Sequence, residues 1–358
     1  LHRVDRRQRQ MCIRDRVNGV VRSLTTTLDE LTRRGHEVDT LTPDLFLTVP
    51  MPGYASIRLA MAPRFGVRRM LDRTRPDIVH IATEGPIGWA ARGWCLARGV
   101  PFTSAFHTRF PEYAAVRTGI SAERFWPIMQ RFHAPSQAVL VSTQSMASEL
   151  AARGIGHTRR WSRGIDHTLF RAEGPRHPLM AALPGPVMLN VGRVAPEKNL
   201  EAFLDADVPG SKVVVGDGPA LESLKRRYPQ VHFLGALAGK ELASAYRTAD
   251  CFVFPSLTDT FGLVVIEALA CGTPVASFPV TGPVDILGHD GCGGDEPLAR
   301  PAGGVDEDLA EAIRAALKVE RMDAAALGAQ FSWERATDQF LAALTAALEG
   351  DRGLLSAA

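Results

Sequence analysis

The feature that most constrains the fold is an alternation of short apolar runs with segments of helical periodicity. In the second half of the chain the apolar runs fall at 187–191, 212–215, 231–234, 251–255 and 274–278. Between them, apolar residues recur every three or four positions. Strands joined by helices run parallel, because each helix carries the chain back along the sheet. The pattern therefore predicts an α/β domain with a parallel sheet and helices on both faces.

The first half repeats this alternation. Its first helix has apolar residues at helical spacing and ends before Gly35, which suits a helix terminus. The remaining pattern predicts strands at 36–41, 77–81, 102–106 and 138–142, and helices over 58–73 and 122–132.

A segment rich in Gly, Pro and His separates the two halves, and 358 residues suit two domains better than one. We expect two Rossmann-like domains that face each other across a cleft, with ligands at the carboxyl ends of the strands. The expected parts are an atypical segment at 1–16, an N-terminal domain at 17–166, a linker at 167–186, a C-terminal donor-binding domain at 187–335, and a helix and tail at 336–358.

Residues 1–16 do not fit this organisation. They hold seven Arg or His residues and no apolar run, so neither a strand nor a signal peptide is predicted there. They lead directly into the well-patterned helical segment that begins at Val17. We hypothesise that the natural first strand is missing and that unrelated sequence stands in its place.

Composition disfavours several classes of partner. The 41 basic residues offset 39 acidic ones, and no Lys/Arg-rich run interleaves with aromatics, which argues against nucleic-acid binding. The longest apolar stretch, 261–280, is interrupted by Glu267, Gly272 and Pro274, so no transmembrane helix is predicted. Five widely spaced cysteines without a C-x-x-C pair suit a reduced, cytoplasmic chain.

The strongest local signal is G-R-V-A-P-E-K-N at 192–199, directly after an apolar run. Arg193 and Lys198 can direct a planar guanidinium and a compact ammonium at one anion, a combination that suits a diphosphate. The alternative is a solvated turn before a helix.

A second signal, D-T-F-G-L-V-V-I-E at 259–267, follows the apolar run at 251–255. Gly262 is expected to open a helix, whose first N–H groups and dipole favour phosphate oxygens. Glu267 lies in the apolar part of that helix, where a carboxylate needs hydrogen-bond donors such as ribose hydroxyls. The alternative is a Glu that reaches solvent at the helix edge.

With these two segments, the C-terminal half resembles the retaining glycosyltransferases of family 4 (group 1), which have the GT-B fold. These enzymes share a motif in which an acidic residue is followed, after seven intervening residues, by a Glu. In this chain the motif is Asp259-x7-Glu267, with Asp at the first position, where many relatives carry Glu. The resemblance implies that Arg193 and Lys198 bind the donor diphosphate. Asp259 is then expected to hold sugar hydroxyls and Glu267 the ribose. The backbone that surrounds the diphosphate and sugar is matched by Phe261, Gly262 and Leu263.

The N-terminal half agrees with this family. Residues 17–22 resemble the Gly-containing loop that approaches the donor phosphates, which makes Gly19 a donor-binding candidate. Residues 104–110 resemble the stretch in which a His faces the transferred sugar, which makes His107 the catalytic candidate. A lone His at a strand end can equally be structural. Residues 161–166 resemble the segment that ends the first domain.

The resemblance implies transfer of a hexose from a nucleotide-sugar donor to a lipid or glycan hydroxyl, with retention and without a metal or other cofactor. The motifs resemble bacterial GDP-mannose-dependent α-mannosyltransferases, with UDP-dependent sulfoquinovosyl- or glucosyltransferases as the alternative. A nucleotide-sugar epimerase and an inactive sugar-nucleotide-binding protein stay open. The D-x-D strings at 205–207 and 306–308 do not follow strands, as a metal–diphosphate site requires, and are interpreted as chance matches.

A basic segment in the first half suggests a further partner. Six arginines from Arg58 to Arg75 interleave with apolar residues at helical spacing. Such a face can lie on anionic lipid, at the inner face of the membrane. A solvated helix with a core-facing side is the alternative.

Overall fold

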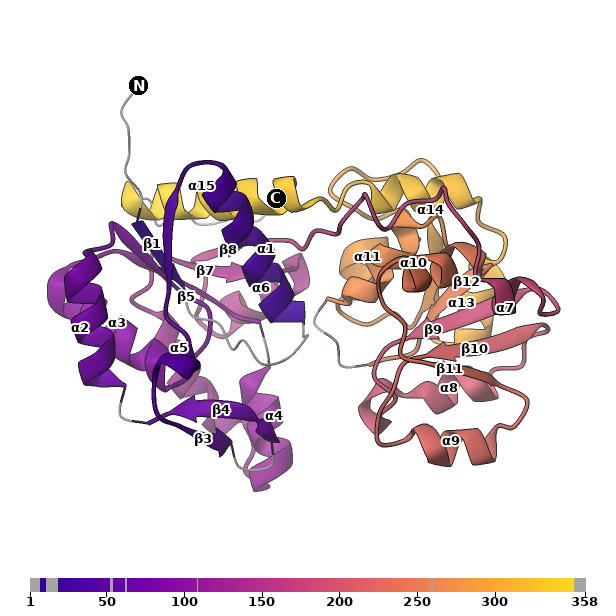
Figure 1. The fold of residues 1–358 in the computed structure, drawn as a ribbon, viewed down its shortest axis with the longest axis horizontal. Coiled ribbons are helices and arrows are strands. Elements are labelled where there is room, and N and C mark those ends of the chain that lie inside the picture. The colour runs from indigo at the N-terminus through magenta and orange to yellow at the C-terminus, as the bar shows by residue number, and fades with distance from the viewer. Residues whose placement is uncertain are drawn as a thin grey trace. The chain divides into compact units, whose positions relative to one another are not determined.

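The computed structural model describes residues 7–10, 19–51, 54–61, 63–107, 109–257, 259 and 261–350. The chain divides into two compact units, Leu1–Gly164 with Trp333–Ala358, and Ile165–Ser332. Each unit is built on a parallel sheet with helices packed on it, as the alternation predicts (Figure 1). Among the described residues, no helix is both long enough and apolar enough to cross a membrane.

The second unit contains a six-stranded sheet in the order β11-β10-β9-β12-β13-β14, with every pairing parallel. The chain builds outward from β9 to β11 and then crosses to β12 on the other side of β9. The loops after β9 and β12 therefore diverge at a topological switch point, where α/β sheets bind ligands. The strands are β9 (Val187–Val191), β10 (Ser211–Val215), β11 (His232–Gly235), β12 (Cys251–Phe254), β13 (Val275–Ser277) and β14 (Gly303–Val305).

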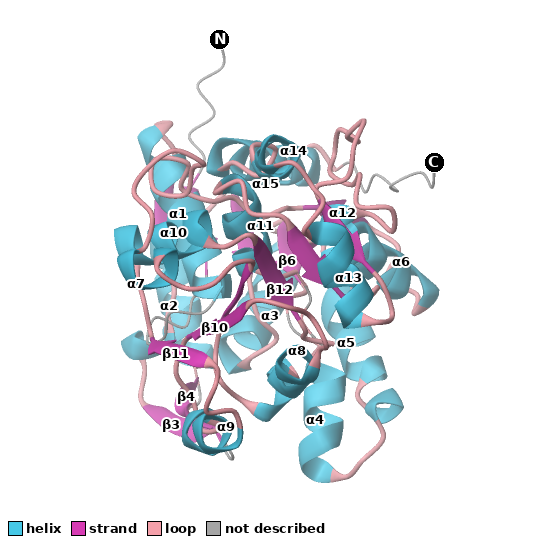
Figure 2. Ribbon diagram, turned by 90° about the vertical axis from the view of Figure 1, so that its right-hand side faces the viewer, coloured by secondary structure: helices cyan, strands magenta, loops and turns pink. Residues whose placement is uncertain are grey.

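Helices cover both faces of this sheet, and each face has its own apolar core (Figure 2). One core includes Phe252 and Val265, and the other includes Phe203 and Ile313. The first face carries α7 (Pro178–Ala181), α10 (Gly239–Thr248), α11 (Leu263–Ala270), α12 (Pro283–Leu287) and α14 (Arg321–Gly328). The second carries α8 (Leu200–Asp205), α9 (Leu221–Arg227) and α13 (Leu309–Ala316).

The first unit has a parallel sheet in the order β2-β1-β5-β6-β7-β8, with its switch point between β1 and β5. An antiparallel hairpin, β3 (Thr48–Met51) and β4 (Tyr54–Ala60), is inserted between β2 and β5. The parallel strands are β1 (Arg7–Gln10), β2 (Glu37–Thr40), β5 (Ile78–Ile81), β6 (Phe102–Ala105), β7 (Ala138–Val141) and β8 (Thr158–Arg160).

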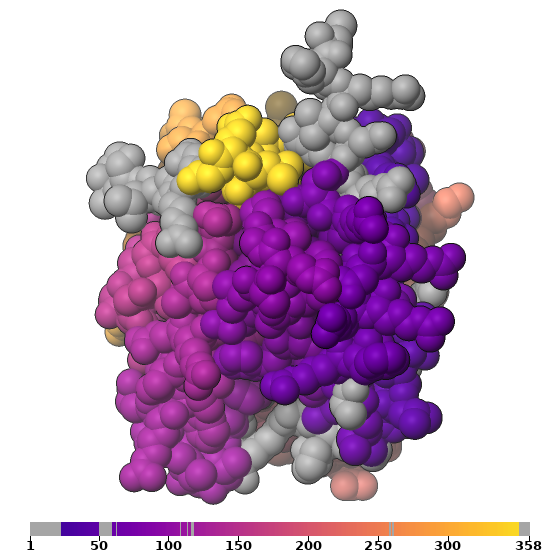
Figure 3. Space-filling view, turned by 90° about the vertical axis from the view of Figure 1, so that its left-hand side faces the viewer, coloured from indigo at the N-terminus to yellow at the C-terminus, as the bar shows by residue number. Residues whose placement is uncertain are grey.

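The helices of the first unit include one from the far end of the chain. The C-terminal helix α15 (Trp333–Leu348) buries Trp333, Phe340 and Leu344 in one core with Leu24 and Trp161. It appears in yellow beside the purple N-terminal half (Figure 3). The other helices are α1 (Gly19–Arg33), α2 (Arg64–Thr74), α3 (Pro86–Arg98), α4 (Phe110–Thr118), α5 (Trp126–His133) and α6 (Gln144–Ala152), with short 3-10 turns η1 (Pro43–Leu45) and η2 (Ala122–Arg124).

The observed units differ from the expected parts at two places. The segment expected as a linker, 167–186, belongs to the second unit, because Phe170 and Met180 are buried in its core. The C-terminal helix was expected from residue 336 but starts three residues earlier, at Trp333. It was also expected to be a separate part, but it completes the core of the first unit.

Three local predictions were wrong. The segment 1–16, expected to contain no strand, contains β1, which pairs with both β2 and β5. Parallel pairing uses backbone groups, so the polar sequence Arg-Gln-Arg-Gln can occupy the strand. The helix expected over 58–73 starts only at Arg64, because the preceding residues pair in the hairpin. The helix expected over 122–132 is the turn η2 followed by α5.

Candidate active site

The loops that follow β9 and β12 meet at the switch point of the second unit. Lys198 ends the 3-10 turn η3 (Pro196–Lys198), and its Nζ donates to Asp259 Oδ1 at 2.7 Å and Oδ2 at 2.8 Å. Asn199 donates to the Pro255 carbonyl at 3.1 Å, which fastens the same two loops together. The structure therefore brings the two strongest motifs of the sequence into one site.

Arg193 lies in the first of these loops and forms an ion pair with Glu197. Both side chains are almost half exposed, at 48% and 43%, whereas those of Lys198 and Asp259 are 28% and 27% exposed. Exposed ion pairs of this kind contribute little to stability, about 0–1 kcal/mol. Both cations can therefore exchange a carboxylate for another anion at small energetic expense.

The helix α11 begins at Leu263, directly after the second loop. Gly262 precedes it with φ +94°, and a Cβ there would lie 3.2 Å from Val265 Cγ2 and 3.3 Å from Phe254 Cζ. Phe261 is buried against Phe331, with ring centroids 6.2 Å apart. The backbone at the start of α11 is thus held by a glycine-dependent turn and a buried aromatic ring. The first N–H groups of a helix lack intrahelical acceptors and can bind an anion.

Glu267 lies inside α11 and is buried, with 3% of its surface exposed. The Tyr246 hydroxyl, from α10, donates to Glu267 Oε2 at 3.2 Å. Burial excludes the alternative in which Glu267 reaches solvent at the helix edge. Tyr246 was not identified from the sequence, because no motif connects it to a carboxylate 21 residues away.

Three glycines outside the predicted set hold the two loops in place. A Cβ at Gly216 would lie 1.8 Å from the Gly192 carbonyl oxygen, and one at Gly218 would lie 2.3 Å from the Val194 carbonyl oxygen. A Cβ at Gly282 would lie 2.9 Å from the Asp259 carbonyl oxygen. Each position therefore requires glycine, because backbone approaches backbone there.

His107 lies in the first unit, directly after β6. Arg163 Nη2 approaches His107 Nδ1 at 2.9 Å, and the His107 ring contacts Trp161 edge-on at 5.3 Å. His107 Nε2 is buried and has no hydrogen-bond partner in the described part of the chain. Burial lowers the pKa of His107 well below the usual 6.5, and the charge of Arg163 lowers it further. His107 is therefore neutral at physiological pH.

A buried chain of hydrogen bonds lies beside His107. His133 at the end of α5 contacts Ser104 Oγ through Nδ1 at 2.8 Å and Glu84 Oε1 through Nε2 at 3.3 Å. Ser104 and His133 are fully buried, and 14% of the Glu84 side chain is exposed. Glu84 follows β5, one of the two strands at the switch point of this sheet. Ser104 lies in the stretch 104–110 identified from the sequence, but no motif connects it to His133 or Glu84, which lie far from it in the chain.

Gly19 is the first residue of α1, in the unit that also holds His107. The preceding residues of its predicted loop, Val17 and Asn18, lie outside the described residues. The predicted residues therefore fall into two groups. Gly19 and His107 belong to the first unit, and the second unit holds Arg193, Lys198, Asp259, Phe261, Gly262, Leu263 and Glu267.

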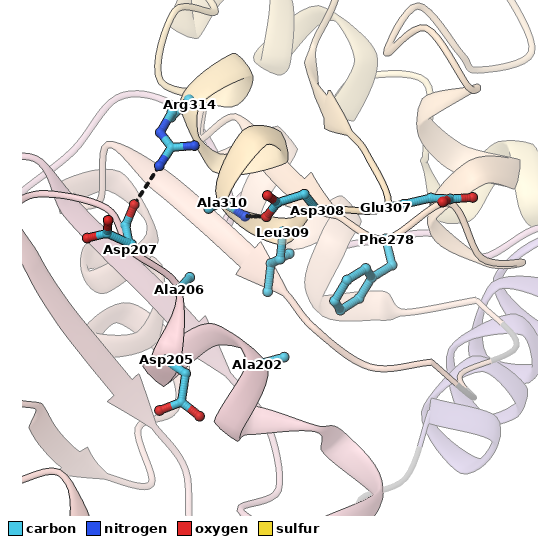
Figure 4. A pocket seen from close by; sticks show the side chains of 10 residues that line it. All are labelled: Ala202, Asp205, Ala206, Asp207, Phe278, Glu307, Asp308, Leu309, Ala310 and Arg314. Carbon is cyan, nitrogen blue, oxygen red and sulfur yellow. Dashed lines mark hydrogen bonds between the residues drawn. The ribbon is translucent and has the colours of Figure 1, made fainter.

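Both D-x-D strings lie elsewhere in the second unit, along a shallow hollow of about 520 Å³ between α8 and α13 (Figure 4). The string at 205–207 ends α8. The string at 306–308 directly follows β14 and precedes α13, so the prediction that neither string follows a strand was wrong for this one. Their carboxylates have local roles. Asp205 accepts from the Tyr228 hydroxyl at 2.8 Å, and Asp308 caps α13 by accepting from Ala310 N at 2.8 Å. No group of three or more potential metal ligands occurs among the described residues.

Residues 17–169 match the family model of Glycosyltransferase Family 4, and residues 185–318 match that of Glycosyl transferases group 1. The chain is 30% identical over 321 residues to a GDP-mannose-dependent alpha-mannosyltransferase of Mycobacterium tuberculosis, which covers 83% of this chain and 84% of the relative. It is 31% identical over 256 residues to Sulfoquinovosyl transferase SQD2 of Arabidopsis thaliana, and this match covers 67% of this chain and 50% of the relative.

Among solved structures, Anabaena Alr3699/HepE in complex with UDP superposes with a TM-score of 0.69 at 16% identity, covering 95% of this chain and 100% of that chain. Sucrose-phosphate synthase from Thermosynechococcus elongatus superposes with the same TM-score at 23% identity, covering 96% and 100%. The fold and the sequence relatives together define a glycosyltransferase with the GT-B fold. The chain belongs to glycosyltransferase family 4.

Proposed function

We propose that the protein transfers mannose from GDP-mannose to a hydroxyl of a lipid or glycan acceptor, with retention at the anomeric carbon. The observation that carries the proposal is the ion pair between Lys198 and Asp259, which joins the loop that holds Arg193 to the loop that precedes α11. The choice of GDP-mannose as donor is supported by relatives named GDP-mannose-dependent alpha-mannosyltransferase in Mycobacterium tuberculosis and Mycolicibacterium smegmatis.

In this proposal the two cations of the second unit bind the donor diphosphate. The bond between the anomeric carbon and the phosphate oxygen breaks, and negative charge develops on the departing nucleoside diphosphate. Arg193, Lys198 and the first N–H groups of α11 stabilise that charge. The acceptor oxygen bonds to the anomeric carbon on the same face, and its proton passes to the leaving phosphate oxygen. No metal ion or other cofactor is required.

The remaining residues orient the sugar and the nucleoside. Asp259 accepts hydrogen bonds from hexose hydroxyls once the diphosphate has taken its place beside Lys198. Glu267 accepts from the ribose hydroxyls, and its buried position beside Tyr246 holds the carboxylate in one orientation. His107 donates from Nε2 to the hexose close to the reacting carbon. This uses a buried donor that has no hydrogen-bond partner in the described part of the protein.

The test is a donor panel of GDP-mannose, UDP-glucose and UDP-sulfoquinovose, assayed for binding and hydrolysis with EDTA present and again with added Mg²⁺. We expect GDP-mannose alone to bind and to be hydrolysed slowly, at equal rates under both conditions. A requirement for Mg²⁺ would contradict the metal-independent mechanism. Turnover of a UDP-sugar alone would assign the alternative donor class. Conversion of the sugar to its epimer without acceptor would identify an epimerase instead.

We also propose that the acceptor is reached at a lipid surface through the first unit. The expected basic segment Arg58–Arg75 is divided between β4 and α2, and the α2 part presents Arg64 and Arg69 to solvent. Beside them Phe65 is 78% exposed and Leu47 is 86% exposed. Met61 N donates to the Leu47 carbonyl at 2.8 Å, so the hairpin and the start of α2 form one surface. Cations around exposed apolar side chains suit anionic lipid.

Vesicle flotation tests this surface. We expect the protein to float with vesicles that contain anionic lipid at low salt and not with neutral vesicles. The double variant Phe65→Ser/Arg69→Ser should lose binding. Leu179→Ser removes a comparably exposed apolar residue of the second unit and should retain it. Equal binding by both variants would contradict the proposal.

A further inference from the structure

Arg163 is a buried cation without a carboxylate partner among the described residues. Only 6% of its surface is exposed, and its Nη1 donates to the carbonyls of Trp161 at 3.0 Å and Ser162 at 3.3 Å. The guanidinium also lies over the Trp161 ring, 4.7 Å from its centroid. Burial lowers the pKa of Arg163 to about 10, so it remains charged at neutral pH. A buried charge that contacts carbonyls and rings but no described carboxylate is energetically expensive and calls for a role.

Its remaining contact is His107. Arg163 Nη2 lies 2.9 Å from His107 Nδ1, and a guanidinium has donors only. His107 Nδ1 must therefore accept, which places the ring proton of the neutral imidazole on Nε2. That nitrogen is buried and has no hydrogen-bond partner among the described residues, so the contact with Arg163 leaves one N–H donor of defined direction.

The other charged and titratable groups around His107 reinforce this state. The charge of Arg163 acts in the same direction as burial, since both oppose a positive charge on His107. His80 on β5 and His133 on α5 also act in this direction when they carry a proton. Glu84 contacts His133 at 3.3 Å, and no ion pair connects it to His107. The carboxylate of Glu149 on α6 is paired with Arg109 at 2.7 Å. No described carboxylate is therefore paired with the His107 ring to stabilise an imidazolium.

We infer that Arg163 is a positioning residue that keeps His107 neutral and fixes its proton on Nε2, facing the transferred hexose. The inference rests on the proposed function for the identity of the ligand. A neutral N–H donor can hold a sugar oxygen without repelling the positive charge that develops at the anomeric carbon during transfer. An imidazolium at the same place would oppose that charge, and the other tautomer would present a lone pair instead of a donor.

The test combines ¹⁵N NMR of the histidine rings with the pH dependence of transfer. In the wild type we expect the His107 signal to report protonated Nε2 and unprotonated Nδ1 from pH 8 to 6. In Arg163→Met the titration of His107 should move upward by about one pH unit or more, because a nearby like charge has been removed. Arg163→Lys keeps a charged donor and should restore most of the wild-type behaviour.

Arg153→Met is the matched control. Arg153 also lies over a tryptophan ring, 4.0 Å from the Trp126 centroid, but pairs with Glu123 and does not contact His107. We expect this variant to leave the His107 signal unchanged. In Arg163→Met, kcat should fall about tenfold or more below pH 7 and recover partly at higher pH, whereas the control keeps the wild-type profile.

The outcomes are separable. A wild-type His107 with its proton on Nδ1, or charged at pH 7, overturns the inference without any variant. An unchanged His107 titration in Arg163→Met overturns it as well, even if activity falls, because the role is then only structural. If the NMR results are as expected but no donor is turned over by the wild type, the proposed function fails and the positioning role stands.

Discussion

The two groups of candidate residues solve opposite electrostatic problems. In the second unit, Arg193 and Lys198 are solvent-accessible and each is paired with a carboxylate. In the first unit, Arg163 and His107 are buried, and no described carboxylate is paired with either of them. Accessible ion pairs exchange partners at little energetic expense, whereas buried polar groups keep a fixed arrangement. In the proposed mechanism, the accessible pairs of the second unit bind the charged leaving group, and the buried groups of the first unit orient the neutral sugar.

The largest effect is expected at Lys198. Lys198→Ala removes a cation and leaves Asp259 facing the diphosphate, so kcat/KM for the donor should fall about 100- to 1000-fold. Steady-state rates with GDP-mannose provide the measurement. Lys225→Ala is the control, because Lys225 also pairs with a nearby carboxylate, Glu222 at 3.2 Å, but lies away from the site. A similar small loss in both variants would mean that the Lys198–Asp259 pair is only structural.

The next effect concerns the backbone at the start of α11. Gly262→Ala places a Cβ at φ +94° and close to Val265 and Phe254, so the second unit should lose about 1–3 kcal/mol of stability together with donor affinity. Gly239→Ala introduces an alanine at φ +55° with no atom within 4 Å of the new Cβ, and should leave donor affinity intact. Thermal unfolding and donor titration separate the two effects. Normal donor affinity in Gly262→Ala would remove this turn from the site.

A smaller effect is expected from the burial of histidine in the first unit. Burial lowers the pKa of His80 to about 3, from a usual 6.5. Between these values the unfolded chain binds a proton that the folded chain does not, so stability falls as the pH falls from about 6.5 toward 3. This one residue contributes a slope of about 1.4 kcal/mol per pH unit. Denaturant unfolding at several pH values measures this slope, and His80→Asn should reduce it by that amount. If the unfolding free energies of the wild type and the variant instead change in parallel with pH, His80 takes up a proton equally in the folded and unfolded chain.

The smallest effect is expected in the hollow between α8 and α13. The double variant Asp205→Asn/Asp207→Asn should leave donor turnover unchanged, with or without Mg²⁺, because both residues lie outside the site. The Asp205 side chain accepts from the Tyr228 hydroxyl, and Asp207 accepts from Arg314 through its backbone carbonyl. Initial rates measured with and without EDTA provide the check. A loss of turnover that added Mg²⁺ restores would reassign the D-x-D strings to a metal site.

Regular elements were predictable where side chains alone define them. The strand at 187–191 was predicted with its observed bounds, because Pro186 and Gly192 flank the apolar run on either side. The strand β1 was not predictable, because its polar residues are held by backbone pairing with neighbouring strands. The β3–β4 hairpin was missed, and the end of β4 was assigned to a helix because the basic and apolar residues from Arg58 onward match helical spacing.

The candidate site was predictable as separate motifs but not as an arrangement. Arg193, Lys198 and Asp259 were identified from two local segments, yet Lys198 and Asp259 lie 61 positions apart and their contact depends on the order of the strands. Arg163 was noticed only as part of the segment that ends the first domain. Nothing in its neighbours in sequence indicates that it is buried or that it contacts His107, 56 positions away.

The position of α15 has a consequence for how the chain is made. Residues 165–332 are contiguous, so the second unit can fold as soon as they have left the ribosome. The first unit is synthesised earlier, but Leu24, Trp161 and their neighbours lack their apolar partner until Trp333 and Phe340 are available. Domains commonly fold in the order of synthesis. Here that order should be reversed, and the N-terminal half should depend on chaperones for longer than the part that follows it.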